Sequence, residues 1–117
     1  MGDIRAAQEV IKDEDCDGVI SVTAHEFPPQ LAIDVDQNGV IKDWHESKPW
    51  ENGNSRSQDH EILYRPNGAL YGMKWESFRK NRNFYKGKTI SHYMPRERSV
   101  DIDNKIDLKL AEILINE

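Results

Sequence analysis

Short stretches of alternating apolar and polar residues, separated by turn signals, run through the first half of this chain. Residues 18–23 are rich in β-branched side chains and predict a strand. Residues 31–35 and 40–44 flank Asp36-Gln37-Asn38-Gly39, and Asn-Gly is favoured in tight hairpin turns. We therefore expect a strand followed by a β-hairpin.

Helical spacing of apolar residues appears at both ends of the chain. Asp3 is expected to cap a helix over residues 4–12. Asn104, with Asp107 three positions later, is expected to cap a closing helix. We expect that helix to pack on the core through an apolar stripe made of Ile106, Leu110, Ile113 and Leu114.

The second half of the chain combines turns with short apolar runs. Residues 45–60 are polar and lack apolar periodicity, which predicts a long loop of the functional or mobile kind. Residues 65–68 predict a turn, and residues 69–73 a buried strand. A short helix over 75–82 and a strand over 89–94 complete the pattern.

This order of elements predicts an α/β fold with a partial mixed sheet, flanking helices and a protruding hairpin. The chain has 117 residues, enough for a single domain over 1–117. It is 37% hydrophobic and 32% charged, and no apolar run is long enough for a transmembrane helix or a secretory signal. We expect a cytoplasmic protein, in which the single cysteine, Cys16, is a buried or idle thiol.

The net charge of −5 disfavours general binding to nucleic acid or membranes, but basic residues concentrate in residues 79–98. That segment also holds Phe84, Tyr85 and Tyr93, so one hypothesis is anion or nucleic-acid binding with aromatic stacking. The alternative is a solvated basic face. The four histidines and Cys16 show no spacing typical of zinc ligands.

The candidate chemistry lies near the end of the chain. Residues 100–103, Val-Asp-Ile-Asp, alternate apolar and acidic side chains, so an extended strand would place Asp101 and Asp103 on one side. Two carboxylates, with water and phosphate oxygens completing the shell, suit Mg²⁺. The alternative is a solvated sheet edge followed by a helix cap.

Three motifs in this order resemble one enzyme family. They are Ser55-Arg56-Ser57-Gln58-Asp59, Asn67-Gly68-Ala69-Leu70-Tyr71, and Met94-Pro95 followed by Ser99-Val100-Asp101-Ile102-Asp103. In combination they resemble the C-terminal half of the CMP-sialic acid synthetases (acylneuraminate cytidylyltransferases). The resemblance implies the C-terminal part of a Rossmann-like nucleotidyltransferase fold, with a dimerisation region over about residues 30–70.

The resemblance also implies roles for six residues. Asp101 and Asp103 match the aspartates that hold Mg²⁺ in the family, which joins CTP to an acidic sugar. The sugar-acid-binding positions of the family fall on Arg56, Gln58, Asn67 and Tyr71. The chain is therefore expected to form a homodimer.

One family feature has no counterpart in this sequence. The CTP-binding signature, an arginine with a serine-lysine pair after the first strand, is absent, and so is a basic residue near positions 27–34. We expect a truncated cytidylyltransferase-like protein that keeps the metal and sugar side but is inactive alone. The competing hypotheses are a non-catalytic dimeric interaction module on the same scaffold and the anion-binding module described above.

Overall fold

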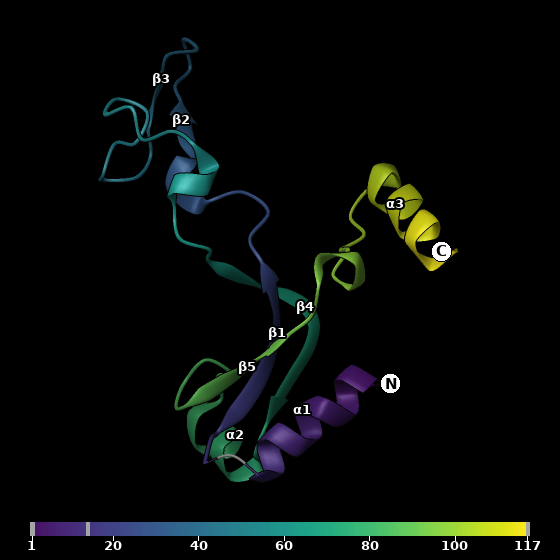
Figure 1. Ribbon diagram of the computed structural model, residues 1–117. Helices are drawn as coiled ribbons and strands as arrows, with labels where there is room; N and C mark the ends of the chain where they lie inside the picture. The colour runs from purple at the N-terminus through teal and green to yellow at the C-terminus, as the bar shows by residue number, and fades with distance from the viewer. Residues whose placement is uncertain (1, 14, 117) are drawn as a thin grey trace. The chain divides into compact units, whose positions relative to one another are not determined.

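A computed structural model describes residues 2–13 and 15–116 of the chain (Figure 1). It divides into two compact units. Unit 1 comprises Met1–Thr23 and Arg65–Glu117, and unit 2 is the intervening segment Ala24–Tyr64. Because unit 1 is built from both ends of the chain, unit 2 is an insertion within it.

The core of unit 1 is a three-stranded mixed sheet in the order β4-β1-β5. Strand β1 (Gly18–Ala24) pairs in parallel with β5 (Thr89–Tyr93), in a register that aligns Val19 with Ile90. On its other side lies β4 (Tyr64–Met73), and the three strands run side by side in Figure 1. The strand over 18–23 and the strand over 89–94 are thus confirmed.

Hydrogen bonds between β1 and β4 show that these two strands are antiparallel. The backbone N–H of Lys74 donates to the carbonyl of Asp17. The hydroxyl of Ser21 donates to the carbonyl of Leu70 and accepts the N–H of the same residue. As residue number rises along β1, the partner's number falls along β4. The sheet is therefore mixed, as the predicted α/β class requires.

Helices flank this sheet. Helix α1 (Gly2–Asp13) packs against β5 and buries Ala7, and α2 (Trp75–Asn81) connects β4 to β5. Helix α3 (Lys105–Ile115) begins with the predicted capping box, in which Asn104 accepts the amide of Asp107 at 3.0 Å. None of the helices that the structure describes is long and apolar enough to cross a membrane.

Unit 2 contains the predicted hairpin. Strands β2 (Ile33–Val35) and β3 (Ile41–Asp43) pair antiparallel, and Gly39 in the connecting turn has φ +83°. The predicted loop over 45–60 contains only a single 3-10 turn, Ser57–Asp59. Its first part is fixed by the carboxylate of Asp43, which accepts two backbone N–H groups from residues 50 and 51.

The turn predicted over residues 65–68 is wrong, because β4 runs through it without interruption. Pro66 is tolerated there since β4 is an edge strand, whose outward N–H groups need no partner within the sheet. Gly68 has φ +76° and absorbs the local kink.

Two expectations about the end of the chain are also wrong. Residues 100–103 belong to no strand, although Val100 and Ile102 do share one environment. They line a cavity of about 400 Å³ with Ala111, Leu114 and Ile115 of α3. The predicted apolar stripe is not packed on a core, because three of its four members are exposed, namely Ile106, Leu110 and Ile113.

The expected capping role of Asp3 is wrong as well. Helix α1 begins at Gly2, so Asp3 lies in its first turn. There its carboxylate contacts His92 Nε2 at 2.9 Å and Arg98 Nη2 at 3.1 Å. The hydrogen bond with His92, and next that with Arg98, hold the pKa of Asp3 below its ordinary value. Asp3 thereby joins α1 to β5 and to the segment after it.

Asp3→Asn should make unit 1 less stable by about 0.5–1 kcal/mol at pH 7. Because the pKa of Asp3 is lower in the folded chain than in the unfolded chain, its stabilisation is complete above about pH 4–5 and is lost as pH falls through the folded-state pKa. Urea unfolding at pH 7 and at pH 3 should therefore show a smaller deficit at pH 3 than at pH 7. Glu9→Gln, an exposed acid on the same helix, is the control, and an equal deficit at both pH values would contradict the assignment.

Candidate functional site

The side chain of Asn67 is the most extensively hydrogen-bonded of the sequence-predicted site residues. It lies on β4 and is 7% exposed. Its Oδ1 accepts the hydroxyl of Ser21 at 2.5 Å and the amide of Ala69 at 3.1 Å. Its Nδ2 donates to Ser99 Oγ at 3.0 Å and to Met94 Sδ at 3.4 Å. Both donor hydrogens and both acceptor positions of the amide are thus used within unit 1.

The segment that Asn67 contacts is a compact turn after β5. This 94–99 turn contains Met94, Pro95, the 3-10 turn Arg96–Arg98 (η3) and Ser99. Ser99 is buried, and its hydroxyl lies 2.8 Å from the carbonyl of Pro95 and 3.3 Å from that of Met94. Met94 donates its backbone N–H to Val22, so the turn begins at the carboxyl end of the parallel strands.

The predicted metal residues follow this turn directly. Asp101 and Asp103 are both exposed, two and four positions after Ser99. Within the part of the chain that the structure describes, neither carboxylate makes an ion pair, while the backbone N–H of Asp103 donates to Asp107. Among the described residues no three His, Cys, Asp or Glu side chains gather into a metal cluster. Because residues 100–103 belong to no strand, their alternation does not by itself place the two carboxylates on one side. By chemistry alone, two carboxylates with water and phosphate oxygens in the other positions are a donor set that Mg²⁺ accepts.

Tyr71 lies four residues beyond Asn67 on β4, in an aromatic cluster. Its ring is 5.6 Å from that of Phe84, which is also 5.6 Å from Phe78 of α2. A hydrogen bond between Tyr71 and Tyr85 raises the pKa of Tyr85. Tyr71 remains 43% exposed, so one edge of this cluster can contact a ligand.

Arg56 and Gln58 belong to unit 2. Both are exposed and flank the start of the 3-10 turn Ser57–Asp59. With the Gln58 amide in its better orientation, its oxygen accepts from Arg56 Nη2 at 2.7 Å and Nε at 3.2 Å. The structure therefore brings these two predicted residues together, and within unit 1 it joins Asn67 to the turn that precedes Asp101.

Two residues of this constellation were not singled out from the sequence. Ser21 is fully buried in β1, and Ser99 appeared only as part of a motif. The available signal was a hydroxyl side chain at position 21, between Ile20 and Val22 in a strand rich in β-branched residues. A buried hydroxyl needs a partner, and Asn67 is that partner.

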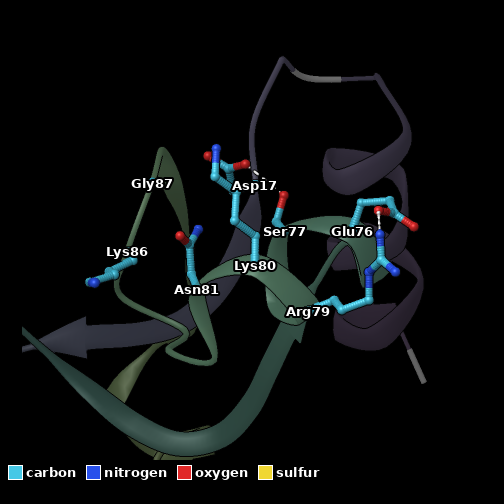
Figure 2. Close-up of a pocket in the computed structure, with 8 residues that line it drawn as sticks. All are labelled: Asp17, Glu76, Ser77, Arg79, Lys80, Asn81, Lys86 and Gly87. Carbon is cyan, nitrogen blue, oxygen red and sulfur yellow. Dashed lines mark hydrogen bonds and ion pairs between the residues drawn. The ribbon is translucent and has the colours of Figure 1, made fainter.

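The basic segment forms a separate open pocket of about 870 Å³ (Figure 2). Its charged lining residues are Arg79, Lys80 and Lys86 together with Asp17 and Glu76. Figure 2 shows Arg79 paired with Glu76, at 2.9 Å, while Lys86 points away from Asp17. Arg98 is likewise paired with Asp3. The pocket is thus of mixed charge, which favours the solvated basic face over a dedicated anion site.

Asp17 has a structural role at the edge of this pocket. Its carboxylate accepts the hydroxyl of Ser77 at 2.6 Å and the amide of Lys88 at 2.7 Å. The bond from Ser77, and next that from Lys88, lower the pKa of Asp17, and nearby Lys74 and Lys80 act in the same direction. The Asp17 carboxylate thus links the residue before β1 to helix α2 and to the residue before β5.

Comparison with known proteins supports the resemblance read from the motifs. The chain is 29% identical over 104 residues to the N-acylneuraminate cytidylyltransferase of Streptococcus agalactiae serotype V, covering 89% of this chain and 24% of that protein. It is 27% identical over 93 residues to the N-acylneuraminate cytidylyltransferase of Escherichia coli O18:K1:H7, covering 80% of this chain and 21% of that protein. No family model matches the chain.

The chain thus spans about a quarter of the length of these curated relatives. The resemblance to N-acylneuraminate cytidylyltransferases is confirmed, and it extends over most of this sequence.

Gly87→Ala should destabilise unit 1 by about 2–3 kcal/mol, against about 1 kcal/mol for Gly68→Ala. Both glycines have positive φ, +86° and +76°, so both variants carry the same backbone strain. Only at Gly87 would the added Cβ also collide with the carboxylate of Asp17, whereas the space around Gly68 is open. Urea unfolding of the two variants measures the difference in the free energy of unfolding. Equal losses would show that the Asp17 side chain moves away from the new Cβ at no energetic cost.

Proposed function

We propose that this chain provides the metal-binding and sugar-acid-binding part of a cytidylyltransferase that acts on an acylneuraminate-type sugar acid. The observation that carries the proposal is the exposed pair Asp101 and Asp103 directly after the 94–99 turn, in a chain that resembles N-acylneuraminate cytidylyltransferases over most of its length. Neither carboxylate is committed to a partner among the described residues, so both are available to a cation.

In this proposal Asp101 and Asp103 hold a Mg²⁺ ion. The ion would supply positive charge that offsets the negative charge developing on the phosphates when the sugar hydroxyl displaces pyrophosphate from CTP. The carboxylates themselves supply only two hard oxygen donors, and Mg²⁺ readily keeps water and phosphate oxygens in its remaining positions.

Each unit by itself offers groups whose chemistry suits a sugar acid. Arg56 offers a planar guanidinium suited to a bidentate grip on the substrate carboxylate, and Gln58 lies within hydrogen-bonding distance to orient it. Tyr71, partly exposed at the edge of the aromatic cluster, would contact the apolar face of the sugar. Binding and orientation are the contributions proposed for these side chains.

Titration of the chain with MgCl₂, followed by backbone amide chemical shifts, should give saturable shifts centred on residues 99–104. Asp101→Asn combined with Asp103→Asn should abolish them, because amide oxygens are far weaker ligands for Mg²⁺ than carboxylates. The control is Glu46→Gln combined with Glu61→Gln, which changes the net charge equally at two other exposed acids. This variant should keep the Mg²⁺-dependent shifts. Saturable shifts that survive in the Asp101/Asp103 variant would refute the metal assignment.

A second function, dimerisation through unit 2, is supported by the exposed apolar residues of its hairpin. Ile33, Val35, Ile41 and Trp44 are 43–65% exposed. A two-stranded hairpin alone is at best marginally stable in water, so these side chains are expected to gain from burial against another surface. We propose that this surface is the hairpin of a second copy of the chain. Such a dimer is compatible with the proposed enzymatic role and also with a non-catalytic interaction module.

Ile41→Asp should convert the proposed dimer into a monomer in sedimentation equilibrium, because it buries an unpaired charge at the contact. Ile106→Asp places the same charge on an equally apolar, exposed position of α3 and should leave the dimer intact. A wild-type chain that sediments as a monomer, or a dimer lost only in the Ile106 variant, would reject this surface.

A further inference from the structure

The hydrogen bonds of Asn67 connect the sheet to the 94–99 turn. On the sheet side, Asn67 Oδ1 accepts from Ser21 of β1 and from Ala69 of its own strand. On the turn side, Nδ2 donates to Ser99 and Met94. Asn67 and its four partners all belong to unit 1. Asp3 provides a second side-chain link on the surface, because it contacts His92 of β5 and Arg98 of the turn.

Ser99 connects the side chain of Asn67 to the backbone of the turn. Its hydroxyl receives a hydrogen from Asn67 and can donate its own to the carbonyl of Pro95 at 2.8 Å. Its backbone N–H bonds to Arg96, and that of Arg98 to Pro95, both at 3.0 Å. The turn is therefore closed by short internal bonds. Ser99 joins it to the buried amide of Asn67, in addition to the backbone bond from Met94 to Val22 and the surface contact of Arg98 with Asp3.

We propose that Asn67 is a positioning residue: through Ser99 it holds the 94–99 turn in the conformation from which Asp101 and Asp103 bind the cation. This inference rests on the proposed function, and it follows from the four hydrogen bonds that the Asn67 amide makes within unit 1. A buried amide gives up such bonds only at the cost of leaving them unpaired.

The physical reason for such an anchor is the exposure of the two carboxylates. Two like charges two residues apart repel, and an unanchored segment would separate them. Groups that orient a metal ligand without touching the metal typically contribute about 10- to 100-fold to its affinity. Asn67 and Ser99 are buried, so they can impose a fixed geometry on the exposed residues that follow.

The test compares two serines that contact the same amide. Ser99→Ala removes the bond on the turn side, whereas Ser21→Ala removes the same atom on the sheet side, and Asn67 itself is unchanged in both. The readouts are Mg²⁺ affinity, from amide shifts in an MgCl₂ titration, and hydrogen exchange at the amides of Arg98 and Ser99 relative to those of β1 and β5.

Ser99→Ala should weaken Mg²⁺ binding by about tenfold and speed exchange at Arg98 and Ser99 by about tenfold more than in the strands. Ser21→Ala should lower global stability but change neither the Mg²⁺ affinity nor the relative exchange of the turn. The inference is overturned if Ser99→Ala leaves both readouts unchanged, or if the two variants change them alike.

Failure of the proposed function gives a different result. If the wild-type chain shows no saturable shifts with MgCl₂, the metal assignment fails. The exchange comparison then decides the positioning role alone, supporting it when loosening of the turn is specific to Ser99→Ala and overturning it otherwise.

Discussion

The complete hydrogen bonding of one buried amide is the constraint on which the site depends. Asn67 sits where β1, β4 and the 94–99 turn meet, and a buried amide must satisfy two donors and two acceptor positions. A serine in β1, a serine at the end of the turn, the Ala69 backbone and the Met94 sulfur together satisfy it. The same requirement therefore links residues 21, 67 and 99 to the start of the acidic segment.

The sequence was most informative where local chemistry determines structure. The β-branched run over 18–23, the Asn-Gly hairpin and the Asn104–Asp107 capping box are governed by a few neighbouring residues, and all three are confirmed. The burial of Cys16 is confirmed too. The α/β class followed from the order of these elements, because strands separated by helices require a layered arrangement.

The expectations that failed depend on tertiary context. Pro66-Asn67-Gly68 has the composition of a turn, yet an edge strand tolerates proline, and the Asn67 side chain has partners far away in the sequence. Val100 to Asp103 has the alternation of a strand, but it pairs with no strand among the described residues. The candidate residues were predictable as a set from motifs, whereas the distinction between contacting and positioning residues needed the hydrogen-bond pattern around Asn67.

The insertion of unit 2 into unit 1 has a consequence for folding and for the evolution of the chain. Asp17 and Lys88 meet across 71 positions, so assembly of the sheet must first close a long intervening segment. Contacts at such separation slow the search for the native state. The entropic cost of closure, however, grows only logarithmically, by about 0.6 kcal/mol for each doubling of length. Ala24–Tyr64 could therefore be lengthened or exchanged for another segment with little thermodynamic effect on the sheet to which the 94–99 turn is joined.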